Sequence, residues 1–251
     1  MSGRILASTV KRIVTQLRHD RRTLALMLVV PVLLLALLYY MFQGETRPPG
    51  APSTFDRIGL IMLGVFPFVI MFLVTSIAML RERTTGTLER LLTTPLGKLD
   101  LLFGYGIAFG LMAAVQAAVA GGVAYWLLGL TTAGSSGLVI VIAIANAVLG
   151  VALGLFCSAF ARTEFQAVQF LPVVVIPQIL LCGLFVARDA MAGWLQAISN
   201  VMPMTYAVEA LQEVGAHADP SGRMWRDLGI VVGCVLVALV LAAATLRRRS
   251  A

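Results

Sequence analysis

Charged residues are scarce in this sequence, and their scarcity excludes a soluble globular protein. Asp, Glu, Lys and Arg make up 12% of the 251 residues, whereas a soluble domain carries about a quarter. Hydrophobic residues make up 59%. The net charge is +7, but the basic residues cluster beside apolar runs, as the orientation of a membrane protein requires. We therefore predict an integral membrane protein without a nucleic-acid partner.

The sequence also lacks any recognisable arrangement of catalytic or metal-binding residues. The three cysteines, Cys157, Cys182 and Cys234, lie in apolar runs without CxxC spacing, and His19 and His217 are far apart. The phosphate-binding pattern G-x-x-x-x-G-K-[ST] does not occur. Catalytic triads, paired carboxylates and HExxH are equally absent. We expect no catalytic residue, no metal site and no cofactor in this chain, so it is not predicted to be an enzyme.

Long apolar runs dominate what is present. A membrane-spanning helix needs about 20 mostly apolar residues, and backbone polar groups in hydrocarbon must be paired within a helix. The sequence thus predicts an all-α, polytopic membrane protein with one domain over residues 1–251. Its six predicted transmembrane helices cover residues 23–42, 58–80, 101–130, 138–161, 168–186 and 228–246.

The predicted spans lack Asp, Glu, Lys, Arg and His. Carriers coupled to protons or ions usually keep such groups in the membrane, because those groups bind the coupling ion. Ion channels need a polar or charged filter, and none is visible. Both classes of transporter are therefore disfavoured.

The N-terminal segment, residues 1–22, combines a basic and an apolar face. Leu6, Val10 and Leu17 recur at helical spacing, while Lys11 and Arg18 fall on another face. This pattern favours an amphipathic helix at the membrane interface; the alternative is a frayed basic flank.

The distribution of basic residues predicts the orientation of the chain. If each of the six runs crosses the membrane once, both termini lie on the same side, and 14 of the 19 Lys and Arg residues lie on that side. The termini are therefore predicted to be cytoplasmic.

A hydrophobic segment, residues 188–215, precedes the last predicted span on the external side. Its apolar stretches are too short to cross a bilayer, which favours short re-entrant or interfacial helices. Asn200-Val201-Met202-Pro203 interrupts them. A loosely packed external loop is the alternative.

A short charged segment follows the second predicted span. Leu88, Leu91 and Leu92 form one small apolar face, and Pro95 limits the helix at its end. Residues 84–95 are therefore predicted to form a short amphipathic helix on the cytoplasmic side. Such a helix can lie in a groove of a partner protein, or it can pack on lipid or on its own bundle.

The pattern E-x-x-x-G-T-L-E-x-L-L-x-x-P at residues 82–95 resembles the region after the second span of ABC-2 type transporter permeases. Residues 200–206, N-V-M-P-M-T-Y, resemble the proline-containing motif of that family before the last span. Six spans and a basic N-terminal helix extend the resemblance along the whole chain.

The resemblance implies a complex in the bacterial cytoplasmic (inner) membrane. Two such permeases, identical or homologous, would assemble with two ATP-binding cassette subunits, which bind ATP and Mg²⁺. The permeases would also contact membrane lipid. It implies that residues 84–95 are a coupling helix, with these residues at the contact: Glu82, Gly86, Thr87, Leu88, Glu89, Leu91 and Leu92. Residues 188–215 would form an external gate that includes Trp194, Pro203 and Tyr206. Candidate residues along a substrate path at the permease dimer interface are Phe66, Phe68, Met71, Phe72, Gln169, Phe170 and Gln178.

The expected function is therefore that of a permease subunit in an ATP-driven exporter. A pathway poor in charge suits a hydrophobic or amphipathic cargo, such as a drug or a lipid. Two alternatives remain: export of a polysaccharide or other glycan by the same machinery, and a membrane assembly factor that does not transport.

Overall fold

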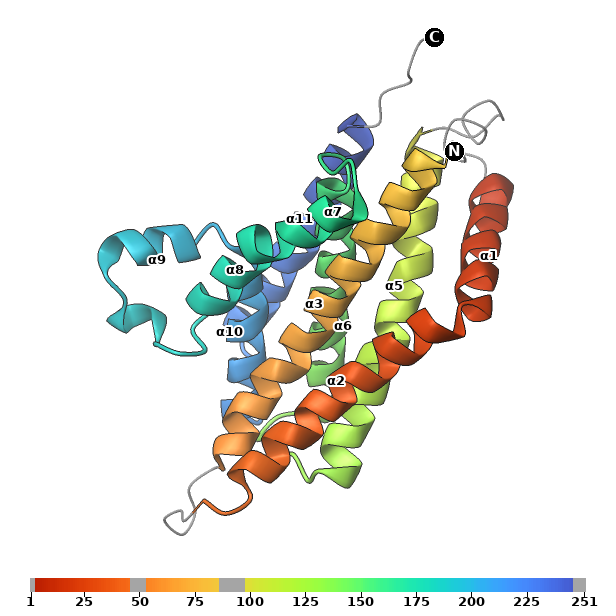
Figure 1. Ribbon diagram of the computed structural model, residues 1–251. Coiled ribbons are helices and arrows are strands. Elements are labelled where there is room, and N and C mark those ends of the chain that lie inside the picture. Colours follow the sequence, from red (N-terminus) through yellow and green to blue (C-terminus); the bar gives the residue numbers. More distant parts are fainter. Residues whose placement is uncertain (1–2, 46–52, 86–97, 246–251) are drawn as a thin grey trace.

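The protein is a bundle of helices in which α3 and α6 are central (Figure 1). The computed structural model describes residues 3–45, 53–85 and 98–245. In these ranges the secondary structure is helical and contains no strand, which confirms the predicted fold class. The helices are α1 (Gly3–His19), α2 (Arg21–Phe42), α3 (Thr54–Thr84), α5 (Lys98–Gly122), α6 (Ser136–Cys157), α7 (Glu164–Phe170), α8 (Ile176–Leu181), α9 (Gly193–Ser199), α10 (Pro203–Ala216) and α11 (Gly222–Thr245).

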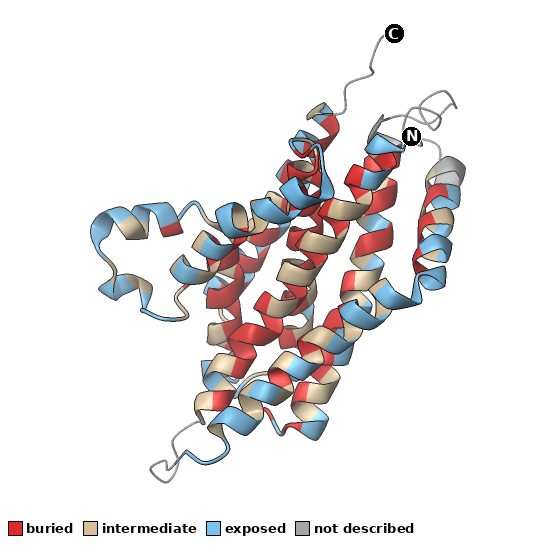
Figure 2. Cartoon of the chain, in the orientation of Figure 1, coloured by how far each residue is buried: buried red, intermediate tan, exposed pale blue. Residues whose placement is uncertain are grey.

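Six helical stretches in the described ranges are long and apolar enough to cross a membrane. They are Arg21–Phe42, Thr54–Thr84, Leu101–Trp126, Ser136–Cys157, Glu164–Leu181 and Gly222–Thr245. Buried residues gather along α3 and α6, whereas much of α2 and α9 is exposed (Figure 2). The chain is therefore a multi-pass membrane protein, and the apolar outer faces are those that lipid or a second subunit can cover.

Two glycines bring α3 and α6 into direct contact. A Cβ atom at Gly150 would lie 2.4 Å from the carbonyl oxygen of Phe68, and one at Gly154 would lie 2.5 Å from that of Phe72. Small residues four apart let helix backbones approach closely, and close van der Waals packing drives helix association in membranes. The backbones of the two helices are therefore in close contact at these turns.

Hydrogen bonds close the end of the bundle at which α3 begins, which we call the Asp56 end. Ser53 and Asp56 cap α3 reciprocally, with Ser53 Oγ accepting from the Asp56 amide at 2.9 Å. Asp56 Oδ1 also accepts from the Thr131 amide at 2.8 Å. The amide of Gly134 donates to the carbonyl of Val214 at 2.9 Å. The loop after α5 is thus fixed to both α3 and α10.

Several helices differ in detail from the predicted runs. The predicted run 101–130 ends in a π-helical segment, η1 (Val123–Leu127), because the backbone reverses at Gly129 with φ of +66°. The run 168–186 is divided into α7, a second π-helical segment η2 (Leu171–Val175) and α8. Pro172 and Pro177 lie in this part, and each lacks the amide hydrogen that a regular helix would use.

The other end of the bundle, which we call the Glu82 end, collects α1, the end of α3, the start of α7 and the end of α11 (Figure 1). A tight corner joins α1 to α2, where Asp20 accepts hydrogen bonds from the amide of Thr23 at 3.1 Å and from its hydroxyl at 2.6 Å. These bonds hold the pKa of the Asp20 carboxyl below its ordinary value. The corner lets α1 run beside α5 instead of continuing α2.

Candidate coupling site and Asp227 charge cluster

An ion pair and a close helix contact hold α1 at the Glu82 end. Arg12 Nη1 lies 3.7 Å from Glu82 Oε1, and Arg12 Nη2 donates to the Tyr105 hydroxyl at 3.1 Å. A Cβ atom at Gly104 would lie 2.7 Å from Thr9 Cγ2, so α1 and α5 touch closely. The junction of Arg12, Glu82 and Tyr105 thus joins α1, α3 and α5.

Because Glu82 is buried, the loss of this ion pair would destabilise the junction. Glu82 is 9% exposed, and a buried carboxylate without a cation beside it is strongly unfavourable. The side chain of Arg12 is 35% exposed, so part of its guanidinium still reaches the surroundings. Any movement of the end of α3 therefore moves α1 with it, or breaks the pair.

A second, more exposed ion pair joins α3 to α7. The guanidinium of Arg81 donates to both carboxylate oxygens of Glu164, at 2.7 and 3.1 Å. Both side chains are more than half exposed. The start of α7 is further ordered by Thr163 Oγ1, which accepts from the Gln166 amide at 3.2 Å. The end of α3 is thus in contact with three other helices.

Of the predicted coupling residues, Glu82 lies within the described ranges. The other predicted coupling residues lie outside the described ranges: Gly86, Thr87, Leu88, Glu89, Leu91 and Leu92. The described chain stops at Thr85 and resumes at Lys98, at the start of α5. The predicted coupling helix is therefore connected at both ends to helices of the Arg12–Glu82–Tyr105 junction.

The seven predicted path residues do not line one surface of the single chain. Phe68, Met71 and Phe72 are fully buried in the core, on the side of α3 that meets α6. Phe66 and Phe170 are half-buried, and Gln169 is exposed. These aromatic side chains occupy two different settings, the packed core and the outer surface.

Gln178, the seventh predicted path residue, links α8 to α10 inside the bundle. It is 2% exposed. Its Nε2 atom donates to the carbonyl of Val174 at 3.0 Å, and its Oε1 atom accepts from the Met204 amide at 3.3 Å. Because Pro203 occupies the first position of α10, the Met204 amide would otherwise lack an intrahelical partner. Gln178 therefore caps α10 from a neighbouring helix.

The three predicted gate residues lie in or beside α9 and α10. Trp194 on α9 is 67% exposed. Tyr206 donates its hydroxyl hydrogen to the carbonyl of Asn200 at 2.6 Å. Its ring lies beneath the guanidinium of Arg188, 5.9 Å from the ring centroid. Pro203 and Tyr206 are thus ordered by the turn between the two helices, while Trp194 projects away from the bundle.

An ionic cluster joins this segment to the last span. Arg188 donates to Glu209 on α10 and to the side chain of Asn200. Arg223 Nη2 on α11 lies 3.5 Å from Glu209 Oε2. Arg223 Nε also lies 4.0 Å from Oδ2 of Asp227, which is fully buried. We call Arg188, Glu209, Arg223 and Asp227 the Asp227 charge cluster.

The predicted run 228–246 contains no acidic residue, but the observed helix is longer than that run. The helix α11 begins at Gly222, six residues before the predicted run, and therefore includes Asp227. Ser221 could have signalled the earlier start, because its Oγ atom accepts from the Met224 amide at 3.1 Å as a helix cap does. The spacing of Arg223 and Asp227, four residues apart, is a second signal.

Among the described residues, no group of three or more His, Cys, Asp or Glu side chains lies where it could hold a metal ion. The acidic side chains of the Asp227 charge cluster face arginines. The two sites are therefore ionic contacts between helices.

In the described ranges, helices without strands and six candidate spans define a polytopic α-helical membrane protein. The sequence matches the ABC-2 type transporter family over residues 4–214. The chain therefore belongs to the family of ABC-2 type transporter permeases.

Individual relatives agree with this assignment. The chain is 27% identical over 156 residues to the probable multidrug ABC transporter permease YbhR of Escherichia coli (strain K12), a region covering 62% of this chain and 42% of YbhR. It is 27% identical over 151 residues to the linearmycin resistance permease protein LnrN of Bacillus subtilis (strain 168), covering 60% and 38% of the two chains. It is 24% identical over 181 residues to ABC transporter G family member 20 of Dictyostelium discoideum, covering 70% and 24%. The matched region spans less than half the length of each of these relatives.

Proposed function

We propose that this chain is the permease subunit of an ATP-driven exporter of a hydrophobic or amphipathic molecule, a drug or a lipid. Family membership supports a transport role. The names of two relatives, a multidrug permease and a linearmycin resistance permease, support a cargo of this kind. Two copies of a separate ATP-binding cassette subunit bind ATP and Mg²⁺ and supply the energy.

The observation that carries this proposal is the junction at the Glu82 end. Arg12, Glu82 and Tyr105 bring three helices together beside the two points where the predicted coupling helix joins the described chain. A partner that pushes on residues 84–95 acts directly on α3 and α5. The ion pair between Arg12 and Glu82 passes the same movement to α1.

Rigid packing carries the movement across the membrane. The middle of α3 is held against α6 by the contacts at Gly150 and Gly154, which leave no space for sliding without repacking. Coupling between distant sites needs packed elements with two discrete arrangements. In this proposal, α3 and α6 move together as one such element.

The Asp227 charge cluster is the second part of the proposed transport mechanism and lies on the external side. It ties the segment 188–215 to α11 through Arg188, Glu209 and Arg223. Paired charges favour one defined arrangement of the helices that bear them. We assign the closed external gate to this arrangement, in which Tyr206 is bound to the turn between α9 and α10.

The proposed assembly contains two permease chains, identical or homologous, in the bacterial cytoplasmic membrane, with both termini in the cytoplasm. The excess of Lys and Arg on one side of the threaded sequence supports this orientation. Exposed apolar faces on α2, α7, α8 and α11 leave area for a second permease chain and for membrane lipid. The substrate path runs between the two chains.

Transport in inverted membrane vesicles tests the proposal. Vesicles containing this chain and the ATP-binding subunit should accumulate a fluorescent amphipathic dye when ATP is added. Vesicles with an ATP-binding subunit that binds but does not hydrolyse ATP are the control and should not accumulate it. Equal accumulation in the control vesicles, or driven by a proton gradient instead of ATP, would refute the proposed energy source.

A further inference from the structure

An open groove lies between α1 and α5 at the Glu82 end. Its volume is about 480 Å³. Apolar side chains form its walls, and Lys11 is its one cationic member among the described residues. The lining residues are Leu6, Ala7, Val10, Lys11, Val14 and Ile107. The groove is therefore an apolar trough with a positive charge on it.

The apolar surface continues from the groove along α5. Ile107, Leu111, Val115 and Val119 are each 40% to 53% exposed. Their spacing of four residues places them on one face of the helix. At a rise of about 1.5 Å per residue, the row extends about 18 Å, which is close to half of a hydrocarbon core of about 30 Å. The row therefore runs from the groove to about the middle of the bilayer.

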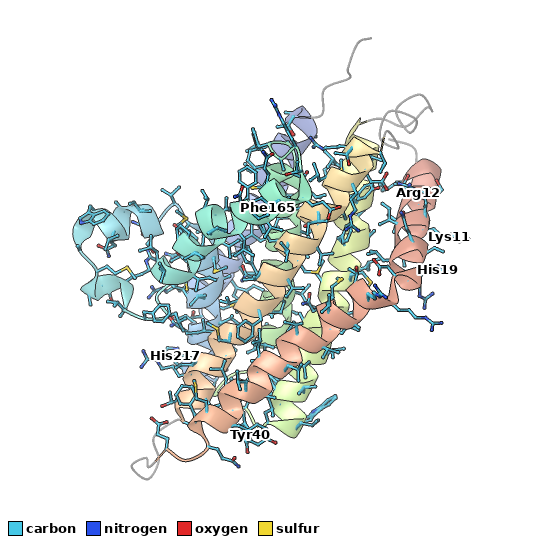
Figure 3. All side chains as sticks on the ribbon, in the orientation of Figure 1. Lys11, Arg12, His19, Tyr40, Phe165 and His217 are labelled. Atoms are coloured by element: carbon cyan, nitrogen blue, oxygen red, sulfur yellow. The ribbon has the colours of Figure 1, made fainter. Side chains whose placement is uncertain are left out.

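Lys11 has no counter-ion in the described part of the chain, although neighbouring cations do. Arg12 is paired with Glu82, and Arg81 is paired with Glu164. Lys11 is exposed, and no carboxylate within ion-pair distance accompanies it among the described side chains. Figure 3 shows Lys11 on α1, near the end of the bundle that also carries Phe165. A lysine stem can lie along apolar surface while its ammonium group reaches the membrane interface.

Exposed arginines surround the same corner of the molecule. Arg18, Arg21 and Arg22 are exposed around the junction of α1 and α2. Basic residues at a membrane surface attract anionic lipid headgroups, by about 1 kcal/mol for each Lys or Arg. An anionic phospholipid matches this surface. Its acyl chain suits the apolar trough and the row of exposed aliphatic side chains, and its phosphate suits the ammonium group of Lys11.

We propose that the groove between α1 and α5 binds one anionic glycerophospholipid. Its phosphate pairs with Lys11, and one acyl chain lies along the row from Ile107 to Val119. A second copy of this chain is a poorer occupant, because the carboxylates of Asp20 and Glu164 near this end are already bonded to Thr23 and Arg81. This site is independent of the cargo and of the ATP-binding partner.

Lipid retention by the intact chain tests the charge. The full chain is placed in nanodiscs of equal phosphatidylglycerol and phosphatidylcholine, and the lipids that remain bound after transfer to detergent are counted by native mass spectrometry. The wild type should retain one phosphatidylglycerol per chain. Lys11→Glu should lower this retention about tenfold or more, while Arg57→Glu, the same reversal at the exposed Asp56 end, should leave it unchanged.

Filling the groove tests its shape. Ala7→Trp places an indole in the groove and should displace the lipid, whereas Gln16→Trp, on an exposed part of α1 outside the lining, should not. Equal retention of the two lipids by the wild type would overturn the proposal, as would equal losses for Lys11→Glu and Arg57→Glu. Disulfide-linked dimers formed through Ala7→Cys would assign the groove to a second copy and would also overturn it.

Discussion

Replacing Glu82 with Gln removes the carboxylate that holds α1 against α3. The substitution keeps the size of the side chain and leaves Arg12 without its counter-ion. Because Arg12 also donates to Tyr105, the hydrogen bond to the tyrosine survives while the charge pairing is lost. The variant therefore tests the ion pair itself.

The size of the effect follows from distance and burial. Two unit charges 3.7 Å apart attract by about 4 kcal/mol at an effective dielectric constant of about 20. Removing one partner of a buried pair costs roughly 3–5 kcal/mol. The side chain of Arg12 is 35% exposed and can turn outward, so we expect a smaller loss of about 2 kcal/mol. This corresponds to a roughly thirtyfold rise in the population with α1 undocked.

Hydrogen exchange of the α1 amides in nanodiscs measures that population. Glu82→Gln should speed exchange roughly thirtyfold, and Arg12→Gln, which also removes the hydrogen bond to Tyr105 and leaves buried Glu82 unpaired, should speed it at least as much. The double variant should exchange no faster than Arg12→Gln. Glu164→Gln is the matched control, because its pair with Arg81 is exposed and worth about 0.2–1 kcal/mol. If the two single effects added fully in the double variant, Arg12 and Glu82 would not be coupled, and the reasoning would be refuted.

Three further changes probe other contacts. Gly150→Leu should prevent close packing of α3 on α6 and lower thermal stability in detergent by several degrees or abolish folding, whereas Gly229→Leu, with open space around it, should not. Asp227→Ala should cost about 2 kcal/mol of stability, because its charge-assisted hydrogen bonds from Arg226 are lost while the remaining arginines are more than half exposed; an unchanged melting temperature, equal to that of exposed Asp219→Ala, would contradict this. Leu88→Asp should abolish co-purification of the ATP-binding subunit, and a retained complex would remove the predicted docking face.

The sequence predicted the spans well because apolar length is a local property. The central helices correspond to the runs 58–80 and 138–161, and α3 extends further at both ends. The extension at its start reflects the capping box of Ser53 and Asp56, a signal that hydropathy does not register. Capping residues therefore locate the polar ends of a membrane-spanning helix better than hydropathy does.

The ionic contacts could not be predicted from pattern alone. Arg12 and Glu82 are 70 positions apart, and Arg188 and Glu209 meet because the chain reverses between α9 and α10. Aromatic and methionine residues in a span gave no indication of whether they face the core or the surface. Phe68 and Phe72 are fully buried, and their backbone carbonyls lie against Gly150 and Gly154 on α6.

Transport by purified components in proteoliposomes tests the central claim most directly. The claim is that a separate ATP-binding subunit drives this chain through its Glu82 end. Liposomes containing both proteins should transport an amphipathic dye against its gradient when ATP is supplied on the side of the ATP-binding subunit. Liposomes with this chain alone should not. Uphill transport by the chain alone would contradict the account.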